Sequence, residues 1–288
     1  MNRRTFLYRA SLATAAVCTP AGGRLGGRSV SGAEPRGAFR PLFDGESLDG
    51  WHHRFAPRDH PGPGNFLVRD GAIWATQLPD RMGALLLSDE TFRDFELALE
   101  IHSDWGCDSG VFLRSDEQGR CIQILNDYLE NGCVGFVFGQ GTGGYISRPI
   151  RLFGEPPGGA PRRVVARDKY DGVAVDKLTH AIDAAQWNAI WRHGEYNDLR
   201  IRIQGDAPII ETYVNGAMVM GFDGRSYHGR FLKDEGRGDL AAPSAWDRAK
   251  VNSLTGDGGH IGLQVHPGPR WGANAYARYR NLRIRELA

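Results

Sequence analysis

The sequence predicts an all-β protein, a sandwich or jelly roll of antiparallel strands with long loop insertions. It has 39 glycines and 15 prolines among 288 residues, spread along the chain without a period. That distribution is typical of many tight turns between short strands. Several segments also alternate between apolar and polar residues, a period of two that a helix does not show. Together these observations exclude a helical bundle, a coiled coil and collagen.

The strands expected in the first half of the chain form two hairpins, with two further strands between them. Residues 66–74 predict two strands around the turn Asp70-Gly71, because Asp-Gly between apolar runs favours a tight hairpin. Leu85 to Leu87 predicts a short buried strand, and residues 95–102 alternate strictly. Residues 111–114 and 121–125 flank a polar turn and predict the second hairpin.

The second half of the chain continues this pattern. Residues 199–206 alternate, and residues 209–222 predict a hairpin around Asn215-Gly216. The final strands are expected at residues 259–266 and 279–287. No boundary divides these strands into two sets, so one domain is expected.

Two long stretches, residues 154–185 and 224–258, show no regular pattern and are expected to be irregular loops. Loops of this length in a compact domain often serve as rims or lids of a site. The glycine-rich segment 139–144 lacks the Lys-Ser/Thr ending of a phosphate-binding loop. We expect it to form a rim rather than a nucleotide site.

The first 33 residues are expected to be a twin-arginine export signal. Arg3 and Arg4 are followed by Phe6-Leu7 and a weakly apolar stretch, without an acidic residue before Glu34. A charged segment before a short apolar segment is typical of export rather than anchoring. The domain would then comprise residues 34–288, in the periplasm or outside the cell.

Charge and composition exclude several classes of partner. The whole chain has a formal net charge of +1, and removal of residues 1–33 leaves −4. A mildly acidic protein has no electrostatic footprint for nucleic acid. No apolar run approaches the roughly 20 residues that a membrane span requires. We therefore expect a small neutral partner.

Cysteines are too few for a disulfide scaffold. Cys18 lies in the signal, which leaves Cys107, Cys121 and Cys133. One bridge among these three would suit an oxidising compartment, and the sequence does not choose the pair. No CxxC or HExxH spacing indicates a zinc site.

Five motifs in a fixed order carry a resemblance to a known family. They include Phe43-Asp44-Gly45, Ser109-Gly110-Val111-Phe112-Leu113-Arg114, Gln123-Ile124-Leu125-Asn126-Asp127, Thr212-Tyr213-Val214-Asn215-Gly216 and Gly259-His260-Ile261-Gly262-Leu263-Gln264-Val265-His266. This set resembles the 3-keto-disaccharide hydrolase domain family over about residues 40–287. Many relatives carry a glutamate two positions before the motif glutamine, where this chain has Cys121.

The resemblance implies a concanavalin A-like jelly roll of two curved antiparallel sheets. It also implies cleavage of 3-keto-glycosides, either by hydrolysis or by elimination followed by hydration. A ketone at C3 acidifies the C2 proton, so a base can form an enolate and the oxygen on C1 can leave. Such a site needs a base, an electrophile for the enolate oxygen and an acid for the leaving oxygen. A divalent metal ion could be the electrophile.

Polar residues within apolar strands are the candidates for this chemistry, because burying them without partners is costly. We expect His266 or Asp127 to transfer protons and Arg114 to orient the keto sugar or stabilise the enolate. The candidates for binding sugar hydroxyls or a divalent cation are Asp108, Gln123 and Glu100, and Gln264 is a further candidate for binding the sugar. Trp271, in the loop after His266, is the candidate for stacking on the sugar.

Each candidate also has a structural interpretation. Arg114 and Asp127 could form a cross-strand ion pair, and His266 could be a structural histidine. Asp108-Ser109-Gly110 could be only a turn. Glu100 and His102 could be solvated or structural, and Trp271 could pack in the core.

The rival function is a non-catalytic carbohydrate-binding domain, because one fold hosts both activities. The discriminating observation is whether Asp108, Arg114, Gln123, Asp127 and His266 lie together in one site.

Overall fold

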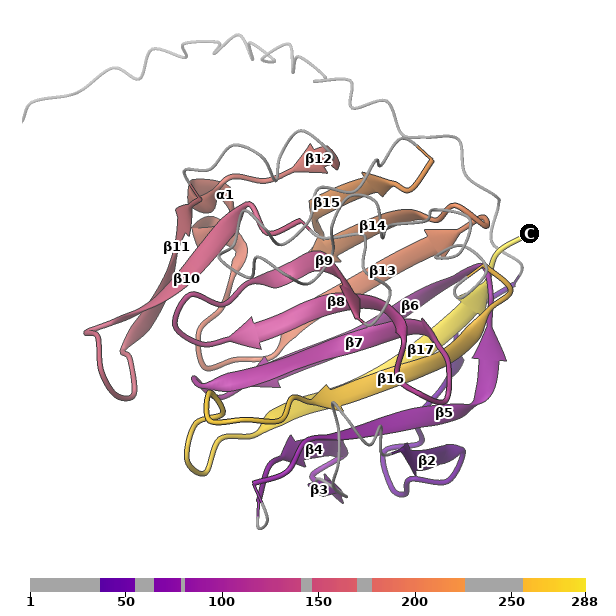
Figure 1. Ribbon diagram of the computed structural model, residues 1–288, viewed down its shortest axis with the longest axis horizontal. Helices are drawn as coiled ribbons and strands as arrows, with labels where there is room; N and C mark the ends of the chain where they lie inside the picture. The colour runs from indigo at the N-terminus through magenta and orange to yellow at the C-terminus, as the bar shows by residue number, and fades with distance from the viewer. Residues whose placement is uncertain (1–36, 55–64, 79–80, 141–146, 170–177, 226–255) are drawn as a thin grey trace, which may run out of the picture. The chain divides into compact units, whose positions relative to one another are not determined.

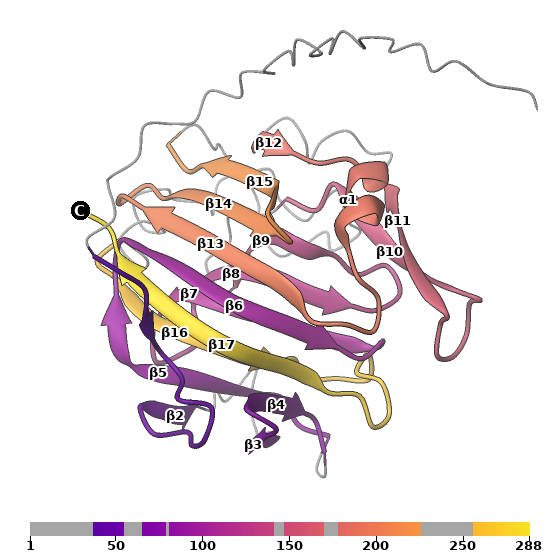
Figure 2. The same cartoon turned by 180° about the vertical axis from the view of Figure 1, so that it is seen from behind.

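We describe a computed structural model in which residues 37–54, 65–78, 81–140, 147–169, 178–225 and 256–288 are placed. The expected export signal and the glycine-rich segment from residue 141 lie outside these residues, as does most of 224–258. The placed residues confirm the all-β prediction. They form a two-stranded sheet and two larger antiparallel sheets packed face to face, with the six-stranded sheet in front in Figure 1 and the nine-stranded sheet in front in Figure 2.

The nine-stranded sheet has the order β12-β15-β14-β13-β6-β17-β4-β3, and β1 pairs with β17. Its strands are β1 (Arg40–Pro41), β3 (Asn65–Arg69), β4 (Ala72–Thr76), β6 (Phe95–Ser103), β12 (Leu178–Ala181), β13 (Asn197–Gln204), β14 (Ile209–Val214), β15 (Ala217–Asp223) and β17 (Ala277–Glu286).

The six-stranded sheet has the order β2-β5-β16-β7-β8-β9. Its strands are β2 (Trp51–Arg54), β5 (Ala84–Phe92), β7 (Cys107–Ser115), β8 (Cys121–Tyr128), β9 (Val134–Gln140) and β16 (Gly259–Val265). In both sheets chain-distant strands are neighbours, since β16 lies between β5 and β7, and β6 lies between β13 and β17.

The predicted hairpins are confirmed. β3 and β4 pair across Asp70-Gly71, and β14 and β15 pair across Asn215-Gly216. All four turn residues have positive φ angles, as two-residue hairpin turns of this kind require.

Alternation along the strands separates two faces of the six-stranded sheet. Val111 of β7, Ile122 of β8 and Leu263 of β16 belong to the core cluster shared with the nine-stranded sheet. Their neighbours Phe112 and Cys121 belong to a separate small cluster with Leu85 and Leu87. We call the face that carries this second cluster the outer face, because it points away from the other sheet.

The expectation of an irregular loop over residues 154–185 is wrong. This stretch contains the end of β10 (Ile150–Glu155), all of β11 (Arg163–Asp168) and β12. β10 and β11 form a hairpin beside α1 (Ala184–Ile190), the one helix among the described residues. Asp183 caps this helix in a capping box with Gln186, a local signal of a helix start.

The three cysteines in the described residues, Cys107, Cys121 and Cys133, are buried and free, so no pair among them forms a bridge. Burial raises the pKa of the Cys107 and Cys121 thiols well above the usual value, which keeps both unreactive. Within the placed residues, no helix has the length and apolar character to cross a membrane.

The structure places Arg114 away from the predicted site. The pairing of β7 with β16 shifts near Arg114, which has a φ of 52°. An irregularity of this kind turns a side chain away from the face that alternation predicts. The buried guanidinium donates to the carbonyl oxygens of Arg93 and Gly205 and to the Asp94 carboxylate at 2.5, 2.8 and 2.7 Å. Arg114 therefore ties the β5–β6 turn to the β13–β14 turn, and it is not the ion-pair partner expected for Asp127.

We predict that Arg114→Met lowers the free energy of unfolding by at least about 1.5–3 kcal/mol, because it removes the hydrogen bonds that a buried charged group makes to Arg93, Asp94 and Gly205. Urea denaturation measures the change. The control is Arg120→Met, which removes an exposed pair with Asp116 and should cost at most about 1 kcal/mol. Equal losses in the two variants would contradict the structural role of Arg114.

Candidate active site

Two carboxyl groups lie side by side on the outer face of the six-stranded sheet. Asp108 of β7 and Asp127 of β8 are directly paired across the two strands, so their side chains leave the sheet on the same face. They are only 6% and 5% exposed. Asp108 lies within a strand, so the interpretation of residues 108–110 as a turn is wrong.

Asp127 holds a proton more tightly than an ordinary aspartate. Burial raises the pKa of Asp127 well above the usual value, and the negative charge of Asp108 and a hydrogen bond between the two carboxyl groups raise it further. The positive charges of Arg148 and Arg270 act in the opposite direction on this pKa. The arrangement is that of two like-charged groups that cannot both ionise freely, so Asp127 is suited to donate a proton.

His266 lies beside this pair. Its backbone N–H donates to the Asp108 carbonyl oxygen at 3.1 Å, and its Nδ1 lies 3.9 Å from Asp108 Oδ2. Nδ1 is also 2.6 Å from the Pro267 carbonyl oxygen, which can only accept. Nδ1 therefore carries the hydrogen, and in the neutral ring Nε2 carries the lone pair. The ring is about 43% exposed, so Nε2 is the atom suited to act as a base.

A pair of amides lies next to the carboxyl groups. Gln123 Nε2 donates to Gln264 Oε1 at 2.7 Å, and both side chains are buried. The Gln123 side chain crosses Gly110, where a Cβ atom would lie 2.0 Å from Gln123 Nε2. Glycine at position 110 thus leaves room for the amide pair.

The loop after β16 is anchored by residues that the sequence analysis did not identify. Gln77 Nε2 donates to the carbonyl oxygens of His266 and Gly268 at 2.6 and 3.0 Å. Arg270 Nε lies 3.7 Å from Asp108 Oδ2, a position similar to that expected for Arg114. The sequence signal that could have identified Arg270 is its position as a cationic residue in the loop after the candidate His266.

Trp271 and Glu100 do not lie where the sequence analysis expects them. Trp271 is 3% exposed and donates its indole N–H to the Ala275 carbonyl oxygen at 3.0 Å. It packs inside the loop and offers no free ring face to a sugar. Glu100 lies on β6 of the other sheet and pairs with Arg280 at 2.6 Å. The structural interpretations of these two residues are therefore correct.

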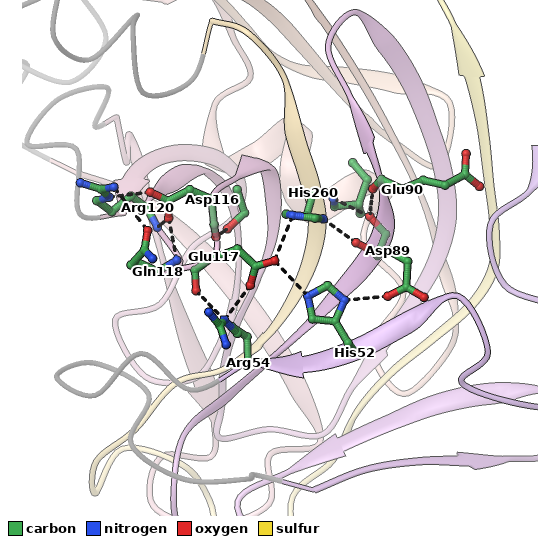
Figure 3. A network of polar contacts seen from close by, with 12 residues as sticks. His52, Arg54, Asp89, Glu90, Asp116, Glu117, Gln118, Arg120 and His260 are labelled. Atoms are coloured by element: carbon green, nitrogen blue, oxygen red, sulfur yellow. Dashed lines mark hydrogen bonds and ion pairs between the residues drawn. The ribbon is translucent and has the colours of Figure 1, made fainter.

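A second polar cluster lies at the opposite end of β16 (Figure 3). Glu117, in the β7–β8 turn, lies 2.6 Å from Arg54 and 3.6 and 3.5 Å from the Nε2 atoms of His52 and His260. His52 Nδ1 contacts Asp89 at 2.7 Å. These contacts fasten the turn to β2 and β16. Among the placed residues, no group of three or more His, Cys, Asp or Glu side chains is arranged to hold a metal ion.

Comparison with solved structures shows the fold. A protein from Parabacteroides distasonis, provisionally described as a glycosyl hydrolase, matches with a TM-score of 0.51 and 19% identity, covering 87% of this chain and 100% of its own. A second such protein from that organism matches with a TM-score of 0.47 and 13% identity, covering 87% and 94% of the two chains. No curated protein matches.

We predict that Asp127→Asn stabilises the protein increasingly as pH rises. The folded state retains a proton that the unfolded chain releases above about pH 4, so the unfolding free energy of the wild type falls from there through the raised pKa. Because asparagine does not ionise, the variant should gain up to about 1.4 kcal/mol per pH unit relative to the wild type. Denaturation between pH 4 and 8 measures the difference. The control is the exposed Glu286→Gln, and a constant difference for Asp127→Asn would contradict the raised pKa.

A family profile identifies the chain. The 3-keto-alpha-glucoside-1,2-lyase-like domain matches residues 38–285, a span that includes both sheets and every residue of the acid pair and its neighbours. Family membership supports a carbohydrate-active function. The chain belongs to the 3-keto-alpha-glucoside-1,2-lyase-like domain family.

Proposed function

We propose that the protein cleaves 3-keto-glycosides by proton abstraction at C2 and departure of the oxygen on C1. The observation that carries this proposal is the buried pair of Asp108 and Asp127 beside His266. The pair supplies a carboxyl group that retains a proton, and the histidine supplies a lone pair. Elimination of this kind needs an acid and a base of these types.

In the proposed reaction, His266 Nε2 takes the C2 proton and the C–H electron pair forms the enolate with the C3 carbonyl. The enolate then expels the C1 oxygen as a C1–C2 double bond forms, and Asp127 protonates the leaving oxygen. Addition of water across the double bond completes the hydrolysis. Arg270, rather than Arg114, lies near enough to Asp108 to stabilise the enolate oxygen.

The amide pair is suited to the sugar hydroxyl groups. Gln123 and Gln264 contribute both donors and acceptors, and Asp108 contributes a further acceptor. The proposed substrate is a small 3-keto-glycoside, and a requirement for a divalent cation is tested by adding a chelator to the assay.

We predict that His266→Gln and Asp127→Asn each lower kcat/KM on a 3-keto-disaccharide by about 10²–10⁴-fold, because each removes a proton-transfer group. The matched control is His180→Gln, an exposed histidine on β12, which should retain wild-type turnover. Undiminished turnover in both site variants would remove these residues from the chemistry. If the wild type binds the keto sugars in calorimetry without cleaving any of them, the protein is a carbohydrate-binding domain instead.

We also propose that residues 1–33 direct export by the twin-arginine route. Replacement of Arg3 and Arg4 by lysine should retain the protein in the cytoplasm, as measured by fractionation, whereas Arg9→Lys should not. Equal export of both variants would contradict this proposal.

A further inference from the structure

A chain of buried polar groups crosses the core behind the acid pair. Tyr279 of β17 places its hydroxyl 2.5 Å from Ser109 Oγ, and Ser109 Oγ lies 2.5 Å from the Gln264 carbonyl oxygen. Asn126 Nδ2 lies 3.4 Å from the Tyr279 hydroxyl and 3.0 Å from Ser103 Oγ. All of these side chains are buried.

The hydrogen bonds that lead from Asn126 to the Gln264 carbonyl are all donated in the same direction. The Gln264 carbonyl only accepts, so the single Ser109 hydrogen is donated to it. Ser109 Oγ must then accept the Tyr279 hydrogen, and the Tyr279 oxygen accepts from the Asn126 amide. Burial raises the pKa of Tyr279 to about 12, so its hydroxyl remains a donor throughout the neutral range.

The position of this chain follows from strand alternation. Ser109 follows Asp108, and Asn126 precedes Asp127, so each polar residue on the inner face is adjacent to a carboxyl group on the outer face. The Gln264 carbonyl belongs to β16, two residues before His266. The Tyr279 hydroxyl, from the nine-stranded sheet, thus contacts Ser109 of β7 and Asn126 of β8. Through Ser109 it is also linked to β16, so it connects all three strands that carry the site.

We propose that Tyr279 is a positioning residue, whose hydroxyl fixes the spacing of β7, β8 and β16 and thereby holds Asp108 against Asp127 beside His266. When both carboxyl groups are ionised they repel each other, and neighbouring strands that are free to shift would then separate them. A buried cross-link between the sheets opposes that separation. The part of this proposal that concerns turnover rests on the proposed function, whereas the part that concerns the acid pair does not.

The test compares Tyr279→Phe with Ser88→Ala. Tyr279→Phe removes one buried hydroxyl and keeps the ring. Ser88→Ala removes a buried hydroxyl that donates to the Glu90 carbonyl oxygen and accepts from Ile261 N–H, near the other end of β16. Both should lose stability, since each leaves buried polar groups unpaired.

Only Tyr279→Phe should alter the acid pair. In carbon-13 NMR of the full chain, Asp127 should titrate at a pH lower by more than about 0.5 unit than in the wild type, as the carboxyl groups separate. With a 3-keto-disaccharide, kcat should fall by about tenfold or more while KM changes less. Ser88→Ala should preserve both the titration and kcat.

An Asp127 titration in Tyr279→Phe equal to that of the wild type would overturn the proposal. If Tyr279→Phe does not fold, Ser109→Ala breaks the same link from β7 and should give the same shift. If the wild type cleaves no 3-keto-glycoside, the proposed function fails, and the NMR titration still decides whether Tyr279 holds the acid pair.

Discussion

The register between β7 and β8 is the constraint on which the proposed chemistry depends. It pairs Asp108 with Asp127 directly, and a slip of one residue would send one carboxyl group into the core. Their burial and mutual repulsion raise the pKa of Asp127. The fold therefore contains an acid that holds its proton more tightly than an ordinary aspartate, and a buried arrangement of this kind is characteristic of catalytic sites.

The two faces of the six-stranded sheet have different roles. On the outer face β7, β8 and β16 carry carboxyl and amide groups, while on the inner face the same strands carry core side chains and the polar chain through Tyr279. Because alternate residues point to opposite faces, a site residue and the residue that holds its strand are neighbours in sequence. Substitutions in the core behind the site can therefore act on the site.

Most of the candidate site was predicted from polar residues within or at the ends of apolar strands. Asp108, Gln123, Asp127 and Gln264 lie together because they occupy outer-face positions of three neighbouring strands. Arg114 was misplaced because the irregular pairing near it breaks the alternation, which no sequence pattern shows. Gln77 and Arg270 act from loops, whose paths depend on tertiary contacts. The helix at residues 184–190 was missed although Asp183 and Gln186 formed a readable capping box.

Ionisable clusters in this protein fall into two kinds that differ in charge balance. Arg114 with Asp94, and Glu117 with Arg54, bring opposite charges together, and each fastens one turn to neighbouring strands. Asp108 and Asp127 bring like charges together, and the nearby arginines only partly offset the effect of burial on the pKa of Asp127. Opposite charges stabilise the folded chain, whereas a buried like-charged pair costs stability. The fold tolerates this loss of stability at the Asp108–Asp127 pair. That is the physical reason to place the chemistry at this pair rather than at the histidine-rich end of β16.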